Sequence, residues 1–176
     1  MLTDLRSLLV DDRFDRETRL TRLQGWRGTE VDQAVSAGWA KSLAPAICAI
    51  GAIAGALLAS PVLLGFMGAT AVMGAIAANH PFEWAYNAVA PRFGRATLPA
   101  NRAAKRLGCF LGSLHLGGAA VAFAAGAPTV GLALALPLGV LAGFVAVTGI
   151  CVPSMLFTAF FGAERGACPS LVQAWT

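Results

Sequence analysis

The feature that most constrains this chain is the absence of any charged side chain from residues 42–78. A second uncharged stretch covers residues 107–162. An α-helix rises 1.5 Å per residue, so about 20 residues cross about 30 Å of hydrocarbon. Each stretch is therefore long enough for two membrane-spanning helices. Soluble helices of this length would carry a polar face, and these stretches have none, so we expect lipid around them.

The charged residues are few, and they are gathered outside the two apolar stretches. They make up 12% of the chain, against about 25% in an average soluble domain. The excess of basic residues lies in 79–106, between the apolar stretches. That position is typical of an orientation signal in a membrane protein, so we expect no nucleic-acid partner.

Short turn motifs divide each apolar stretch in two. Ser60-Pro61 divides the first stretch, and the segment 126–128 (GAP) divides the second. Ser is a good N-cap and Pro is tolerated at the first helical position. We therefore predict an all-α, polytopic membrane protein with four transmembrane helices arranged as two hairpins. The predicted spans lie near 40–59, 62–78, 107–125 and 129–151.

The predicted chain has three parts: an amphipathic N-terminal arm (1–29), a transmembrane domain (30–162) and a cytoplasmic tail (163–176). Thr29 is followed by Asp32, a weak relative of the capping box. This pattern predicts a first helix that starts near Glu30 and runs without a break into the membrane.

The loops predict the orientation of the chain. The two hairpin turns carry no charge, whereas basic residues cluster near the other span ends. By the positive-inside rule, both termini are expected on the cytoplasmic side. The residues that carry this argument are Arg22, Arg27, Lys41, Arg92, Arg95, Arg102, Lys105 and Arg106.

Amphipathic side chains near the same span ends are expected to anchor the protein at the membrane interface. These are Trp39, Lys41, Phe82, Trp84 and Tyr86.

Small residues recur at helical spacing inside the spans, in Gly51-x-x-x-Gly55 and Gly108-x-x-x-Gly112. Such pairs let helix backbones approach closely. They serve either packing within one bundle or docking of another subunit or a second copy of the chain.

The predicted topology places all four cysteines in or near a reducing compartment, where structural disulfides are rare. Three readings remain: small apolar residues, redox or sulfur-transfer thiols, or metal ligands together with His80 or His115. Cys151 begins the segment Cys-Val-Pro-Ser, in which Ser154 stands where a second thiol would allow a local disulfide. No complete catalytic motif is present, so an enzyme is not favoured, and no metal or cofactor is assigned.

His115 lies inside an apolar stretch, and an intramembrane imidazole is a candidate functional residue. Its alternative role is a neutral side chain bonded to Ser113, Thr148 or a carbonyl on a neighbouring helix. Glu83 is expected to pair with Arg92, Arg95 or Lys105 as an ordinary contact. If the hairpins form a parallel repeat, their exits converge. This convergence would bring His80, Glu83, Cys109 and Cys151 toward each other, and together with His115 they form the candidate functional patch.

Three motifs resemble a family of bacterial four-helix integral membrane proteins of unknown function. They are HPFEWAYN (80–87), LPANRAAKRLGCFLG (98–112) and GICVPSMLF (149–157), and the resemblance covers roughly residues 31–160. It implies location in the bacterial inner membrane and no established activity. Many relatives carry Cys-x-x-Cys in the last motif, so Ser154 departs from the pattern and weakens a dithiol interpretation.

The leading functional hypothesis is a non-catalytic accessory or assembly subunit of a larger membrane complex. It would dock through its small-residue helix faces and its N-terminal arm. The alternative is a membrane thiol site on the cytoplasmic face for redox chemistry, sulfur transfer or soft-metal handling. The expected partners are the lipid bilayer and other membrane subunits or a second copy of the chain.

Overall fold

A computed structural model describes residues 16–22, 24 and 26–165, and it contains helices but no strand in this part of the chain. The predicted all-α class is confirmed. Residues 16–22 are helical. The elements that follow are α2 (Thr29–Ser36), η1 (Gly38–Ser42), α3 (Leu43–Leu57), α4 (Pro61–Ile76), α5 (Pro81–Val89), η2 (Ala90–Phe93), α6 (Ala103–Ala124), α7 (Pro128–Thr148) and α8 (Val152–Arg165).

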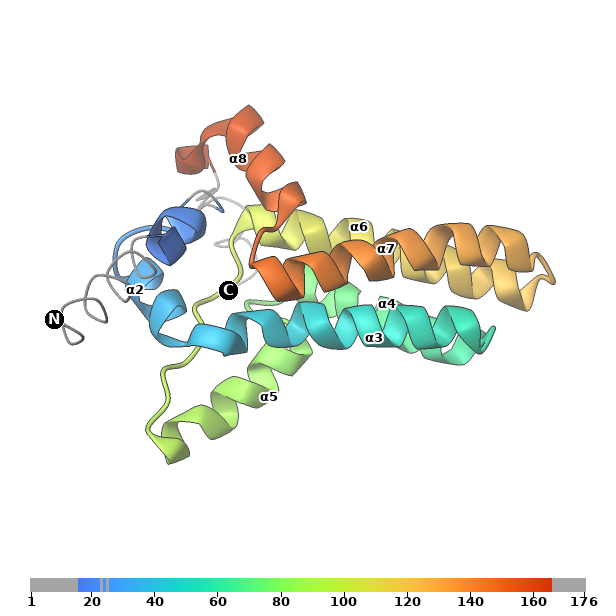
Figure 1. The fold of residues 1–176 in the computed structure, drawn as a ribbon, viewed down its shortest axis with the longest axis horizontal. Coiled ribbons are helices and arrows are strands. Elements are labelled where there is room, and N and C mark those ends of the chain that lie inside the picture. Colours follow the sequence, from blue (N-terminus) through green and yellow to red (C-terminus); the bar gives the residue numbers. More distant parts are fainter. Residues whose placement is uncertain (1–15, 23, 25, 166–176) are drawn as a thin grey trace, which may run out of the picture.

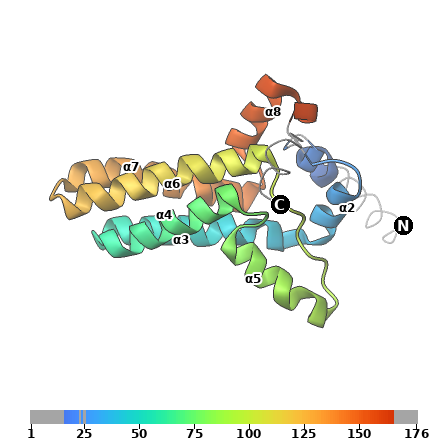
Figure 2. The same cartoon turned by 180° about the vertical axis from the view of Figure 1, so that it is seen from behind.

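Four helices, α3, α4, α6 and α7, run side by side as a bundle (Figure 1). The most extensive packing joins α4 to α6 and α3 to α7. The two short turns, 58–60 and 125–127, lie together at one end of the bundle. At the other end α5 and α8 diverge in opposite directions, as the view from behind also shows (Figure 2). We call this the open end of the bundle.

The predicted turn motifs begin helices as expected. The Ser60 hydroxyl accepts a hydrogen bond from the Leu63 amide at 3.3 Å, and Pro61 is the first residue of α4. Pro128 likewise occupies the first turn of α7, after Gly126 with a φ of 74°. Both hairpin turns therefore use the local chemistry that the sequence indicates.

The glycines of α3 allow α3 and α4 to approach closely. A Cβ at Gly51 would lie 2.7 Å from Met67 Sδ, and one at Gly55 would lie 2.7 Å from Leu64 Cδ2. Leu64 and Met67 belong to the buried core. In α6, a Cβ at Gly108 would lie 3.9 Å from Pro153 Cβ, and one at Gly112 would meet nothing within 4 Å. The Gly51–Gly55 pair is thus used for packing within the chain.

Three helical segments are long and apolar enough to cross a membrane: Gly38–Leu57, Ala103–Ala124 and Pro128–Thr148. A fourth candidate joins Pro61–Ile76 to Pro81–Phe93, with a bend of 72° between them. The bundle also exposes large apolar side chains that water would solvate poorly. They include Ile50, Leu57, Val62, Phe66, Ile76, Val121, Val140 and Val147. The chain therefore has the composition and surface of a membrane protein with three to four candidate spans.

The prediction of one continuous first helix from Glu30 is wrong. The α2 helix ends at Ser36, and Gly38 adopts a φ of 58° before the 3-10 turn η1. A residue with a left-handed backbone ends an α-helix, and glycine adopts that conformation at little cost. The N-cap of α2 is Gly28, with no side-chain cap hydrogen bond, so the predicted cap at Thr29 is also wrong.

The end of the second apolar stretch forms a helix that the sequence analysis did not anticipate. The α7 helix ends at Thr148, because Gly149 has a φ of 70°. The chain then turns and continues as α8, which exposes Val152, Leu156 and Phe160 along one face. Part of the apolar stretch 107–162 therefore diverges from the bundle.

Candidate functional site

Buried polar side chains gather at the start of α5, near the open end of the bundle. His80 is only 2% exposed and Glu83 is fully buried. Glu83 Oε2 accepts a hydrogen bond from the His80 amide at 3.3 Å, and Oε1 accepts one from Lys105 Nζ. The Lys105 ammonium also lies 5.6 Å from the centre of the Trp26 ring, a cation–π distance. Glu83 thus pairs with Lys105, one of its three expected partners.

His80 brings two cysteines into this cluster. Its Nε2 lies 3.9 Å from Cys48 Sγ, and its ring centre lies 5.0 Å from that of Phe82. A Cβ at Gly74 would lie 2.6 Å from His80 Cδ2 and 3.0 Å from Cys109 Sγ. Because Gly74 has no side chain, the His80 imidazole and the Cys109 thiol can both occupy the space beside it.

The environment of His80 favours the neutral imidazole. His80 lies in the break between α4 and α5, outside the bundle helices. Burial lowers its pKa below the ordinary value of 6.5; the Glu83 carboxylate opposes this effect and the Lys105 ammonium reinforces it. Among the described residues, the buried Nδ1 has no hydrogen-bond partner. A neutral imidazole next to two thiols can accept or donate a proton.

A cavity of about 140 Å³, the inner cavity, lies beside this cluster. Its polar groups come from Cys48, His80, Lys105 and Cys109. Apolar residues of α6 and α7, including Leu116, Leu138 and Leu141, line the remainder, and Gly108 and Gly112 also border it. The second small-residue pair thus provides space inside the bundle.

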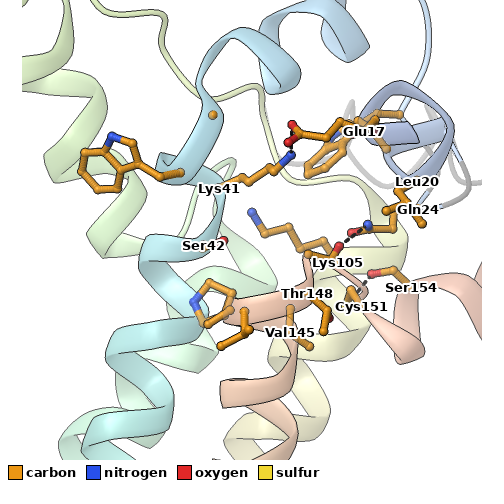
Figure 3. Close-up of a pocket in the computed structure, with 18 of the residues that line it drawn as sticks. Glu17, Leu20, Gln24, Lys41, Ser42, Lys105, Val145, Thr148, Cys151 and Ser154 are labelled. Carbon is orange, nitrogen blue, oxygen red and sulfur yellow. Dashed lines mark hydrogen bonds and ion pairs between the residues drawn. The ribbon is translucent and has the colours of Figure 1, made fainter. Parts of the chain in front are cut away.

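A larger cavity of about 430 Å³, the outer chamber, opens at the open end of the bundle (Figure 3). Its walls come from the arm, η1, the starts of α3 and α6, the last turn of α7 and the first turn of α8. Cys151 Sγ accepts a hydrogen bond from Ser154 Oγ at 3.0 Å, and Ser154 is only 1% exposed. The ammonium groups of Lys41 and Lys105 project into the same space (Figure 3).

Two polar contacts hold the arm over the outer chamber. Lys41 Nζ lies 2.9 Å from Glu17 Oε2, and Gln24 Nε2 donates to the Gly149 carbonyl at 2.6 Å (Figure 3). Nearby, Arg102 donates through Nε and Nη2 to Glu30 Oε2, at 2.8 and 2.5 Å. The arm is therefore fixed to η1 and to the end of α7, and α2 is fixed to Arg102, the residue that precedes α6.

The candidate patch divides into three places. His80, Glu83 and Cys109 lie together near the inner cavity, and Cys151 lies in the outer chamber. Lys105 lines both cavities and connects them. His115 lies elsewhere: it is exposed, and its Nδ1 lies 2.9 Å from the Leu111 carbonyl of its own helix. Six residues separate it from Cys109, which is not a whole number of helical turns, so the two side chains face different directions.

Sequence reasoning missed Cys48 as a member of this cluster. One feature of the sequence indicates that Cys48 belongs here: it lies in the half of the first span that is nearer to the basic residues. The contact with His80 depends on how α3 is rotated within the bundle, and an almost uniformly apolar helix does not reveal its rotation. Cys48, Cys109 and Cys151 are free cysteines, while Cys168 lies outside the described residues. Within residues 16–22, 24 and 26–165, no group of three or more His, Cys, Asp or Glu could hold a metal ion.

The predicted interface anchors differ in exposure. Trp39 and Trp84 are 64% and 70% exposed. Tyr86 packs edge-on against Trp39, with ring centres 6.0 Å apart, and its hydroxyl donates to the Ala96 carbonyl at 3.1 Å. Phe82 is half-buried beside His80, and Lys41 pairs with Glu17. The two exposed indoles are therefore the most accessible of the five.

Comparison with known proteins identifies a family for most of the chain. Residues 41–161 match a family described as a domain of unknown function, DUF4395. The chain belongs to the DUF4395 family. No curated protein and no solved structure matches it. The DUF4395 domain contains Cys48, His80, Glu83, Cys109 and Cys151, whereas the arm residues that cover the outer chamber precede it.

Proposed function

We propose that this member of the DUF4395 family is a membrane protein whose open end performs thiol exchange through Cys151. The single observation that carries the proposal is the position of Cys151 Sγ, 3.0 Å from the Ser154 hydroxyl in the outer chamber. The thiolate is the nucleophilic form of cysteine, and the Ser154 hydroxyl is placed to donate a hydrogen bond to the sulfur of Cys151. The ammonium groups of Lys41 and Lys105 line the same chamber, paired with the carboxylates of Glu17 and Glu83.

The proposed step is attack on a disulfide. The Cys151 thiolate forms a bond with one substrate sulfur, and the bond between the two substrate sulfurs breaks. The other sulfur leaves as a thiolate and takes up a proton from water. The product is a mixed disulfide on Cys151, so this step needs no metal and no cofactor.

We further propose that the protein lies in the bacterial inner membrane with four spans in two hairpins. Both termini and the outer chamber would face the cytoplasm. The supporting pattern is the absence of charge from the turns 58–60 and 125–127, together with the basic residues Arg102, Lys105 and Arg106 at the open end. The diverging helices α5 and α8 would then lie near the interface, where Trp84 and Phe160 are exposed.

Labelling in oriented vesicles tests both the function and the orientation. The protein is prepared with Cys168→Ser and treated with a charged, membrane-impermeant maleimide. We expect labelling of Cys151 in inverted inner-membrane vesicles, little labelling in right-side-out vesicles, and loss of the signal in Cys151→Ser. Cys151 that stays unlabelled in inverted vesicles after membrane integrity is confirmed would contradict an accessible cytoplasmic thiol.

The accessory-subunit hypothesis is the second candidate. Its supporting observation is the exposed apolar surface of α5 and η2, which includes Trp84, Val89 and Phe93 and lies away from the bundle. The Gly51–Gly55 pair supports it less, because Met67 and Leu64 occupy that contact within the chain. Purification from native membranes in mild detergent tests it: a partner chain should co-purify, and Trp84→Ala should weaken the association. A protein that runs alone at monomer mass refutes it.

A further inference from the structure

We propose that Cys109 is the resolving thiol for Cys151, so that the two cysteines form a redox pair across α6 and α8. This proposal rests on the proposed function of Cys151. In a Cys-x-x-Cys motif the resolving thiol would stand at position 154, where this chain has Ser154. We assign that role to Cys109, on a different helix.

The packing of α6 against α8 brings the two cysteines near each other. A Cβ at Gly108 would lie 3.9 Å from Pro153 Cβ, an ordinary van der Waals contact. Cys109 directly follows Gly108, and Cys151 lies two residues before Pro153. Cys109 and Pro153 also line the inner cavity together, so this part of α6 faces the start of α8.

Lys105 lines both the inner cavity, which contains Cys109, and the outer chamber, which contains Cys151. It precedes Cys109 by four residues on α6, so the two side chains share a face of the helix. Lys105 and Cys109 both line the inner cavity, while Lys105 and Cys151 both line the outer chamber. A disulfide substrate would therefore meet Cys151 first, from the chamber, with Cys109 behind it.

Cys48 is the competing candidate for the second thiol. It lies on α3, lines the inner cavity and contacts His80 Nε2 at 3.9 Å. Cys48 and Cys109 line the inner cavity together, and α6, the helix that carries Cys109, packs against α8. Cys109 is therefore the thiol that we assign to the pair with Cys151.

The second step completes the reduction of the substrate. The Cys109 thiol loses its proton, and its sulfur forms a bond with Cys151 Sγ while the mixed disulfide breaks. The second substrate sulfur leaves as a thiolate and is protonated. The substrate disulfide gains two electrons and becomes two thiols, while the Cys109–Cys151 pair is oxidised to a disulfide. A cytoplasmic dithiol reductant would restore the pair.

The aromatic disulfide DTNB provides the test, because each reaction step releases one coloured thionitrobenzoate ion. The full chain in detergent, with Cys168→Ser, should release two ions per chain during the fast phase and retain no adduct. Its unreduced peptide map should contain a Cys109–Cys151 disulfide. Cys109→Ser should release one ion and retain a stable adduct on Cys151, and Cys109→Ala serves as a second variant with an apolar replacement.

Cys48→Ser is the matched control, since it removes a thiol from the same inner cavity. It should behave like the parent protein in ion release and in peptide mapping. A stable adduct on Cys151 in the parent protein, or a disulfide that maps to Cys48, would overturn the assignment of Cys109 while Cys151 remained a reactive thiol. Failure of Cys151 to react with DTNB in any variant would instead overturn the proposed function itself.

Discussion

Lys105 on α6 donates a hydrogen bond to the fully buried carboxylate of Glu83 on α5. The other oxygen of that carboxylate accepts from the His80 amide, so one side chain both caps α5 and pairs with α6. The contact ties the bend after α4 to the helix that carries Cys109. It also gives a buried negative charge its compensating positive charge.

The first prediction concerns this ion pair. Glu83→Gln leaves the Lys105 ammonium without its buried counter-charge and should lower the free energy of unfolding. We expect the free energy of unfolding to fall by about 3 kcal/mol. This is the lower end of the range for breaking a buried ion pair, because Lys105 is partly exposed. Thermal unfolding in detergent measures the effect. Arg95→Gln, at an exposed position, is the control, and equal melting temperatures for both variants would contradict the prediction.

The second prediction concerns the space beside Gly74. Gly74→Ala places a methyl group 2.6 Å from His80 Cδ2 and should destabilise the protein by about 1–3 kcal/mol through overpacking. Gly65→Ala is the matched control on the same helix, because its Cβ would make only an ordinary 3.9 Å contact with Ala120. Denaturant titration of both variants checks the difference, and comparable stability of the two would show that the site tolerates the methyl group.

The third prediction concerns the hydroxyl donor in the outer chamber. Ser154→Ala removes the hydrogen bond to Cys151 Sγ and should slow alkylation of Cys151 severalfold. A hydrogen bond to a charged group contributes about 1.5 kcal/mol, and the higher intrinsic nucleophilicity of the unbonded sulfur offsets part of that loss. Stopped-flow labelling with a charged alkylating reagent measures the rate. Thr21→Val tests another chamber hydroxyl, which donates to the Glu17 carbonyl of its own helix, and should leave the rate unchanged. An unaltered rate in Ser154→Ala would remove the proposed role of the hydroxyl.

The fourth prediction concerns pH. The pKa of His80 is lowered in the folded protein, so the unfolded chain binds a proton first as the pH falls below 6.5. Stability should therefore be fully present above pH 6.5 and decrease below it, towards the lowered pKa of the folded state. His80→Gln should flatten this decrease. Melting temperatures across the acidic range check it, and identical slopes for both proteins would contradict a buried neutral His80.

Much of the architecture follows from local signals in the sequence. The uncharged stretches predict spans, because no polar face is present to meet water, and Ser60-Pro61 predicts the start of α4 because a hydroxyl cap and a fixed φ act locally. The convergence of His80, Glu83 and Cys109 was predicted from the assumption that the span exits meet. Their roles in function remain predictions.

Other features depend on information that a pattern of apolar residues does not contain. The break at Gly38 depends on a left-handed backbone, and Gly is also common inside these helices, so its identity alone did not reveal the break. The outward position of His115 and the inward position of Cys48 depend on helix rotation. In helices with apolar residues on every face, rotation is set by tertiary packing.

The bend between α4 and α5 connects a candidate membrane span to the cluster around His80. The α4 helix has 16 residues, which gives a length of about 24 Å, shorter than the roughly 30 Å of hydrocarbon in a typical bilayer. Hydrophobic mismatch of this kind is relieved when the lipid thins or the adjoining segment tilts. The adjoining segment here begins with His80 and Glu83, so in the proposed four-span topology the acyl-chain length of the surrounding lipid would act on the residues that neighbour Cys48 and Cys109.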